Sequence, residues 1–303
     1  DMSKMFNWKN FNIRRKITLG FSSIISIALI TGIVLLINLY QISTKTGEMV
    51  NAHIPSANAS NQLMRYWLET SEFMRSYQFS GNAYFHQQHN ITLQRMQNAL
   101  AELQTLTKER DQELQEKGVF ITLLANYTRE YQQAAERYHQ KRSQFNNELD
   151  NFRTDLDALA GNSAYAGSFT NLQVLNHLHR LNAQLGQGLY ERLDAAEFEK
   201  TLNTLENRLR QGGGSSTFRA SAEDLMTTGK RLSEDLFDLR KEELKTYEWS
   251  KKVMWEVRAS ADIGLDQIIL TGNISNDITM RQRNLQIITL SLTLLLGLLF
   301  IVL

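Results

Sequence analysis

A single proline among 303 residues constrains this chain more than any other feature of its sequence. Proline interrupts the interior of a helix, and sandwiches or barrels of short strands need proline and glycine at close intervals for their turns. A chain whose one proline is Pro55 is therefore predicted to be all-α, with long uninterrupted helices. The chain also has no cysteine, which excludes disulfides, a thiol nucleophile and cysteine-bound metal centres.

Two uncharged apolar runs lie near the ends of the sequence, at residues 17–39 and 285–303. A helix rises about 1.5 Å per residue, so each run is long enough to cross a hydrocarbon layer of roughly 30 Å. The first is too long for a signal peptide and lacks a cleavage site of small residues. We expect transmembrane helices at 17–40 and 285–303, and we expect the chain to be the front part of a longer polypeptide. The alternative for the second run is a buried C-terminal tail.

The charges before the first apolar run indicate the orientation in the membrane. Residues 1–16 contain five lysines and arginines against Asp1 alone, whereas the whole chain has a net charge of +1. Basic flanks stay in the cytoplasm, so we expect a cytoplasmic tail at 1–16 and an extracytoplasmic segment at 41–284. The rest of the chain has a net charge of −3, by subtraction of +4 from +1, which argues against a nucleic-acid partner.

The segment between the two runs is predicted to be helical and repeated. Apolar residues recur at spacings of three and four from Phe120 to Leu159, with Arg142 as the one interruption. A second stripe runs from Leu225 to Ile268 and includes Leu244, Tyr247 and Leu265. Breaks are expected at Pro55, Ser80–Asn82, Lys117–Gly118, Ala160–Ser163 and Gly212–Ser216.

These breaks predict helices in the order short, short, long, repeated twice: 56–80, 83–108, 119–159, 168–191, 195–211 and 217–284. Two long helices can run through two bundles, and four short ones can complete them. We therefore expect two stacked four-helix bundles, flanked by the two transmembrane helices.

At two places the sequence resembles a known class of proteins. The basic start followed by Ile17-Thr18-Leu19-Gly20-Phe21 is similar to bacterial methyl-accepting chemotaxis receptors. The segment Arg75-Ser76-Tyr77-Gln78-Phe79-Ser80-Gly81-Asn82 resembles the end of the first helix in their helical bimodular sensor domain. The resemblance implies a homodimer in the bacterial inner membrane with a periplasmic sensor domain over 41–284. It also implies a small-molecule ligand, such as an organic acid, or a liganded periplasmic binding protein as partner.

Candidate ligand-binding residues are polar side chains that interrupt apolar seams, because helical bundles build their sites from facing side chains. Three arginines fit this description, namely Arg75, Arg142 and Arg258, and we expect at least one to contact an anionic group of a ligand. Further contacts are expected from Tyr77, His179, Asn182 and Trp255. The alternative for each arginine is structural: pairing of Arg258 with Asp262 one turn away, or an extended side chain that reaches solvent.

In the bimodular family, arginines of the first, fourth and last helices hold carboxylate ligands, and Arg75 and Arg258 lie in comparable segments. The chain departs from that pattern at two points. Glu72 precedes Arg75 where the family has a second arginine, and the fourth helix offers His179 and Arg180.

No catalytic motif and no cofactor motif is found, so the chain is not expected to be an enzyme. His86 and His89 could share a helix face and a metal, but the interpretation we prefer is surface histidines without metal. Two alternatives to a chemoreceptor remain. One is the input domain of a sensor histidine kinase, including hybrid kinases that read a periplasmic binding protein. The other is a membrane-anchored coiled-coil structural or interaction protein.

Overall fold

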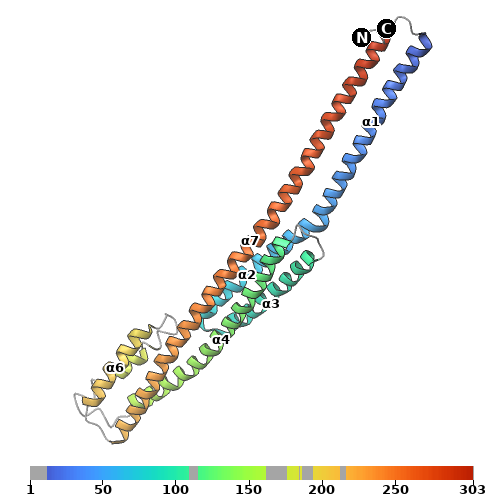
Figure 1. The fold of residues 1–303 in the computed structure, drawn as a ribbon. Coiled ribbons are helices and arrows are strands. Elements are labelled where there is room, and N and C mark those ends of the chain that lie inside the picture. The colour runs from blue at the N-terminus through green and yellow to red at the C-terminus, as the bar shows by residue number, and fades with distance from the viewer. Residues whose placement is uncertain are drawn as a thin grey trace, which may run out of the picture. The chain divides into compact units, whose positions relative to one another are not determined.

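The computed structural model describes residues 12–108, 115–161, 176–183, 185, 194–211 and 216–302. Within these ranges every residue is helical except Asn12, Gly81, Asn82, Gly161 and Asp194, so the all-α prediction is confirmed (Figure 1). Most of the expected basic tail 1–16, most of the expected helix 168–191 and most of the turn 212–216 lie outside the described residues.

The elements in chain order are α1 (Ile13–Glu48), the π-helical turn η3 (Met49–His53), α2 (Ile54–Ser80), α3 (Ala83–Lys108), α4 (Gln115–Ala160), α6 (Ala195–Gln211) and α7 (Ser216–Val302). The predicted helix starts at 83 and 195 are confirmed, and the predicted ends at 108 and 211 coincide with the last described residue of each helix. The predicted break at 80–82 is also confirmed.

Two predicted breaks are wrong. Pro55 lies in the first turn of α2, and the chain stays helical through it because η3 precedes it. In this wider turn the N–H of Ile54 donates to the carbonyl of Met49, and the wider turn relieves the clash that a proline ring makes with the preceding turn. Gly118 lies in the first turn of α4, where a glycine interrupts few intrahelical hydrogen bonds.

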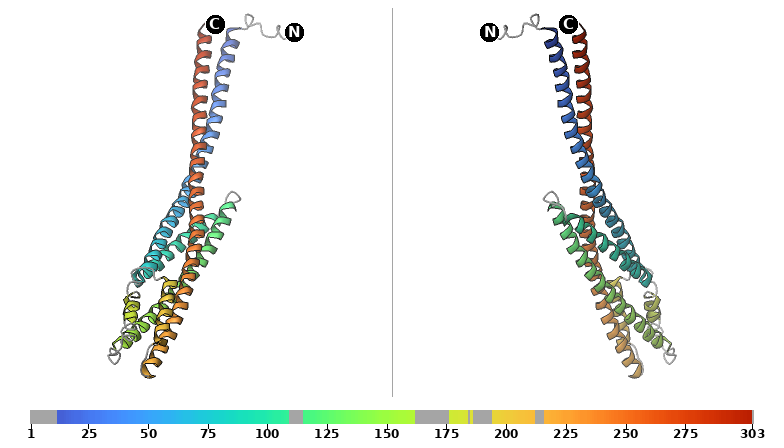
Figure 2. Two further views of the ribbon diagram at one scale, coloured as in Figure 1. Left: turned by 90° about the vertical axis from the view of Figure 1, so that its left-hand side faces the viewer. Right: turned by 90° about the vertical axis from the view of Figure 1, so that its right-hand side faces the viewer.

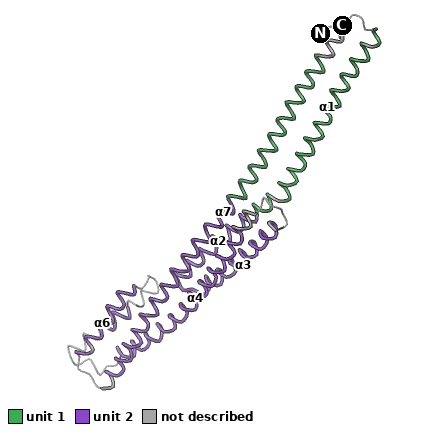
Figure 3. The backbone as a smooth tube through the Cα atoms, viewed as in Figure 1, with its two compact units in different colours: residues 1–58, 262–303 green, residues 59–261 purple. Residues whose placement is uncertain are grey.

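The described residues divide into two compact units, residues 1–58 with 262–303 and residues 59–261 (Figure 3). In the first unit, α1 lies beside the C-terminal part of α7 (Figure 2). Thr31 Oγ1 is 3.4 Å from Thr289 Oγ1, and His53 Nδ1 is 3.2 Å from Gln267 Oε1. A β-carbon on Gly264 would lie 3.3 Å from the α-carbon of Ala57, so glycine permits a close approach of the two helices there.

Apolar side chains on both helices of this unit are exposed. They include Phe21, Ile25, Leu29, Ile30, Ile33 and Leu36 on α1, and Ile287, Ile288, Leu290, Leu292, Leu294 and Leu295 on α7. Among the described residues, one helical stretch is long and apolar enough to cross a membrane, and it begins at Lys16. The other expected span, 285–303, runs into residues whose side chains are not described.

The second unit has a continuous apolar core built along α4 and α7. Trp67 of α2 packs edge-on against Tyr131 of α4, with ring centroids 4.8 Å apart. Farther along α4, Phe152 packs edge-on against Phe198 of α6 at 6.2 Å. Each such side chain, fully removed from water, contributes roughly 1.5–3 kcal/mol. Thus α4 contacts α2 and α3 in its first half and α6 in its second.

The seam of α4 follows most of the sequence prediction, with Leu124, Tyr131, Ala134, Tyr138 and every later member of the stripe buried. Of the other two predicted members, Tyr127 is half-buried and Phe120 is exposed. The seam of α7 follows the prediction from Leu225 to Leu239 and departs from it farther along. Leu244 and Tyr247 are 57% and 54% exposed, whereas Glu243 and Thr246 are buried. Glu243 is accommodated because Arg240 Nη1 lies 2.7 Å from its Oε2, and the Thr246 hydroxyl donates to the Glu242 carbonyl at 2.9 Å.

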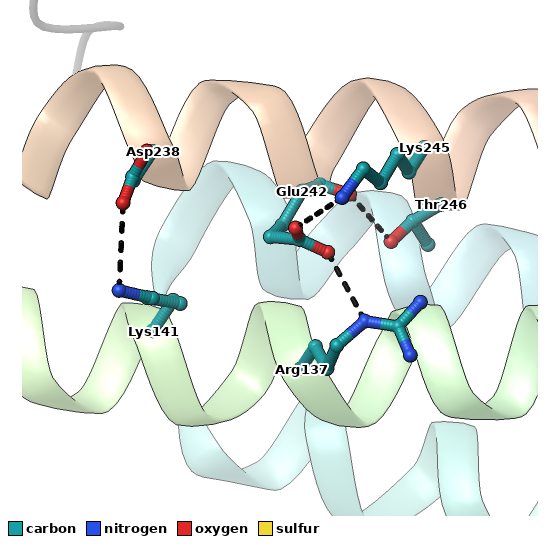
Figure 4. A network of polar contacts seen from close by, with 6 residues as sticks. All are labelled: Arg137, Lys141, Asp238, Glu242, Lys245 and Thr246. Atoms are coloured by element: carbon teal, nitrogen blue, oxygen red, sulfur yellow. Dashed lines mark hydrogen bonds and ion pairs between the residues drawn. The ribbon is translucent and has the colours of Figure 1, made fainter.

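Ion pairs join α4 to α7 along their exposed edges (Figure 4). Arg137 Nε lies 3.3 Å from Glu242 Oε2, and Lys245 Nζ lies 2.6 Å from Glu242 Oε1. Lys141 Nζ lies 3.6 Å from Asp238 Oδ2. Exposed pairs of this kind contribute little free energy, so the apolar core holds these helices together while the pairs favour one register.

Candidate functional site

The turn between α2 and α3 sets the geometry of the candidate site. Gly81 has a φ of 66°, in the left-handed region that favours glycine, and its N–H donates to the Tyr77 carbonyl at 2.7 Å. The side-chain oxygen of Asn82 accepts the N–H of Tyr84 at 2.9 Å and so caps α3. The turn brings the end of α2 and the start of α3 against the middle of α4.

Six ring side chains meet beside this turn, and we call them the ring cluster: Tyr77 of α2, His86 and His89 of α3, and Tyr131, Tyr138 and His139 of α4. The rings of His86 and His139 are stacked, with centroids 3.5 Å apart and planes 4° from parallel. Tyr77 Oη lies 2.7 Å from His139 Nδ1, and His89 Nε2 lies 3.0 Å from Tyr131 Oη. The ring cluster therefore links three helices by hydrogen bonds and stacking.

A groove of about 610 Å³ opens between α3 and α4 next to the ring cluster. Its lining is mainly polar. The polar residues are the imidazoles His86 and His89, the amides Asn90, Gln94, Gln97, Gln132, Gln133 and Gln140, and the charged Glu136 and Arg137. Gln97 Nε2 donates to Gln132 Oε1 at 2.8 Å across the two helices.

Burial changes the acid–base properties of the ring cluster. Burial lowers the pKa of His89 to about 4, because the charged imidazolium would lose its hydration. Burial also lowers the pKa of His86, and the neighbouring His139 lowers it further. Burial raises the pKa of Tyr138 to about 12 and raises the pKa of Tyr77. At neutral pH, His86 and His89 therefore offer neutral imidazole nitrogens.

Two predicted site residues lie at the ring cluster. Tyr77 is a member, and Arg142 is next to it, since a β-carbon on Gly81 would lie 3.3 Å from Arg142 Nη2. The charge of Arg142 lowers the pKa of Tyr77 and of Tyr138 against the larger effect of burial. Arg142 Nε is buried without a hydrogen-bond partner among the described residues. Contact of Arg142 with a ligand stays a prediction.

The other predicted residues lie elsewhere, and no described contact joins them to Tyr77 or Arg142. The side-chain amide of Asn182 is hydrogen-bonded to α4: it accepts from Arg153 Nε at 3.2 Å and donates to Asp157. His179 is exposed. Arg75 on α2 and Arg258 on α7 are exposed, and Trp255 is 73% exposed. The three arginines are thus not gathered in one pocket.

Sequence reasoning missed His139, Tyr131, Glu136 and the glutamines as members of one site. The available signal was weak: His139 follows a seam residue, and His86 and His89 lie one turn apart on α3. In the part of the chain that the structure describes, no three histidine or acidic side chains are arranged to hold a metal ion.

In comparison with known proteins, the chain matches no family model, no curated sequence and no solved structure. The groove is therefore interpreted from its own chemistry. Neutral imidazoles, amides and one carboxylate can hold a small polar solute by hydrogen bonds, in a concave site between two helices.

Proposed function

We propose that the chain is the sensory part of a transmembrane chemoreceptor that binds a small solute outside the cytoplasm and passes the signal through α7. The observation that carries the proposal is the continuity of α7. One helix, Ser216–Val302, contains both the partner of groove residue Arg137 and a run of exposed apolar side chains. Residues 41–284 would be periplasmic, between spans at 17–40 and 285–303 of the bacterial inner membrane.

The exposed apolar side chains of α1 and of the end of α7 support two spans. In water, a surface of this size would be an interaction or aggregation site, whereas lipid covers it at no cost. The contact between Thr31 and Thr289 supports two neighbouring spans, because it joins one apolar run to the other.

The packing of α4 and α7 supports two stacked four-helix bundles. α4 meets α2 at Trp67 and Tyr131, and it meets α6 at Phe152 and Phe198. α7 meets α2 where Ser60 Oγ lies 3.1 Å from Ser260 Oγ. The fourth helix of the second bundle would be the predicted short helix that contains the buried residues Leu178, Leu181 and Leu185.

Signal transfer would begin at the wall of the groove. Arg137 lines the groove and pairs with Glu242 of α7, so a solute that draws Arg137 or its neighbours inward also acts on α7. A solute can shift the receptor only by binding one state of α7 more tightly than the other. As in the receptors that the sequence resembles, the working form would be a homodimer.

The test uses the full chain in lipid nanodiscs and takes advantage of its lack of cysteine. With Thr31→Cys and Thr289→Cys introduced together, the rate of disulfide formation reports on α1 and α7 in the first unit. A panel of organic acids, amines and amino acids is screened by thermal shift, and each hit is tested on the cross-linking rate. We expect a saturable hit that changes this rate at least about twofold.

Glu242→Gln is the matched control, because it removes the partner of Arg137 on α7 and leaves the groove lining intact. We expect this variant to bind the solute but to respond less in cross-linking. If no solute shifts the melting temperature, the chain is a spacer and the proposal is wrong.

A further inference from the structure

The charge balance of the groove between α3 and α4 indicates the kind of solute that fits it. Glu136 contributes a carboxylate to the lining, and its described partner is the neutral Gln140, whose Nε2 donates to Oε1 at 3.2 Å. No ion pair to Glu136 occurs among the described residues. The Glu136 carboxylate is therefore open to solvent and available to a cationic ligand.

The one cation among the described residues of the lining is engaged on its far side, by a carboxylate of α7 that it shares with Lys245. Arg137 Nε lies 3.3 Å from Glu242 Oε2 on α7, where Lys245 also binds the same carboxylate (Figure 4). The two histidines of the lining add no positive charge at neutral pH, because burial lowers the pKa of both His86 and His89. Arg142 does not line the groove.

Two amide oxygens of the groove lining remain available as hydrogen-bond acceptors. Gln140 uses its Nε2 on Glu136, which leaves its Oε1 to accept. Gln97 uses its Nε2 on Gln132, which leaves the Oε1 of Gln97 to accept. An ammonium group has three N–H donors and no acceptor, so a carboxylate and amide oxygens match it, whereas a carboxylate ligand would be repelled by the Glu136 carboxylate.

From this arrangement we infer that the groove binds a small aliphatic ammonium compound, a primary amine or diamine, with Glu136 as its counter-ion. The inference rests on the proposed function, since it names the solute class of the same site. The lining from His89 to Gln97 spans about 12 Å along α3, at 1.5 Å per residue, which accommodates a short diamine at full extension.

The experiment is calorimetric titration of the full chain in nanodiscs with 1,4-diaminobutane, with propylamine and, for comparison, with succinate. The wild type should bind the amines and not succinate. Glu136→Gln keeps the shape and one acceptor but removes the charge, and it should weaken amine binding about 10- to 100-fold. Its melting temperature should stay near that of the wild type, because Glu136 is exposed.

The matched control is Asp150→Asn, which removes an exposed carboxylate of the same helix outside the groove and should leave amine affinity unchanged. Equal amine affinity in Glu136→Gln and wild type would overturn the inference. Binding of succinate that tightens in Glu136→Gln would overturn it too, while leaving the sensory function intact. Absence of any thermal-shift hit, amine or otherwise, would remove the proposed function together with the inference.

Discussion

At the scale of single residues, two titratable groups in the second unit have pKa values displaced by their surroundings, and each links protonation to stability. His89 is buried against Tyr131 and is held neutral. Asp235 of α7 faces Glu148 of α4, and burial together with the Glu148 carboxylate raises the pKa of Asp235 to about 6. The hydrogen bond that Asp235 supplies lowers the pKa of Glu148. The two pKa shifts change the free energy of unfolding in opposite directions as the pH falls.

For His89 the folded pKa is about 4 and the ordinary value is 6.5, so the unfolded chain binds the proton more readily. The contribution of neutral His89 to stability is complete above pH 6.5. As the pH falls toward 4, protonation of His89 in the unfolded chain lowers the free energy of unfolding by about 3 kcal/mol. His89→Gln removes this titration and can still hydrogen-bond Tyr131. Denaturant unfolding of both proteins between pH 7 and pH 4 should show the steeper decline in the wild type, and parallel profiles would contradict the prediction.

For Asp235 the folded pKa lies above its ordinary value, so ionisation above pH 6 costs stability. Asp235→Asn should therefore raise the free energy of unfolding at pH 7.5 by about 1 kcal/mol, a figure reduced because the side chain is partly exposed. The gain should shrink at pH 4.5, where the native carboxyl is protonated.

The control for Asp235→Asn is Asp238→Asn, one turn away, which breaks the exposed pair with Lys141. It should change the free energy of unfolding by less than about 0.5 kcal/mol. A destabilised Asp235→Asn protein at pH 7.5 would show that the Asp235 carboxylate is needed in its ionised form.

At the scale of elements, the packing around α7 differs along its length, as two of its glycines show. At Gly229 the helix passes so close to α4 and α6 that a β-carbon would lie 2.8 Å from Leu202 Cδ2 and 3.0 Å from Phe152 Cε2. At Gly272 no atom lies within 4 Å of that position. Glycine is thus required for packing at the first position and not at the second.

These two glycines give a matched pair of variants. Gly229→Ala should lower the free energy of unfolding by about 1–3 kcal/mol, because overpacking of a buried contact outweighs the gain of about 1 kcal/mol in helix propensity. Gly272→Ala should be neutral or stabilising by up to about 1 kcal/mol. Denaturant titrations followed by tryptophan fluorescence measure both, and a stabilised Gly229→Ala protein would mean that Leu202 and Phe152 can move aside.

At the scale of the whole molecule, the proposal depends on which segments face which side of the membrane. Under the proposal, two described and exposed residues would lie on opposite sides of the membrane: Arg14 at the start of α1 and Asn147 in α4. Since the chain has no cysteine, single cysteines at these positions can be labelled without background.

In intact bacteria, a maleimide that does not cross the inner membrane should label Asn147→Cys and not Arg14→Cys. Both should react after the membrane is permeabilised. The basic flank of the first span is the physical reason for this orientation. Labelling of Arg14→Cys alone in intact cells would place the helical segment in the cytoplasm and remove the basis for an extracytoplasmic sensor.

Much of the fold could be predicted from the sequence, because helix formation, breaks and apolar periodicity are local properties. The scarcity of proline, the turn at Gly81 and the stripe along α4 predicted a helical fold, the break at 80–82 and most of the buried face of α4, and these are confirmed. Pro55 and Gly118 were misjudged, since a local signal does not tell whether a wider turn or a helix start will accommodate the residue.

Only the tertiary structure decided the register of α7 and the membership of the candidate site. Leu244 would be the better core residue by hydropathy alone, but the packing of α7 against α4 buries Glu243, which Arg240 compensates. Likewise, His86 and His139 are 53 positions apart, by subtraction of 86 from 139, and they stack because α3 packs along α4. Sequence determines what each helix can bury, whereas contacts between helices that are distant in the chain determine which polar groups meet.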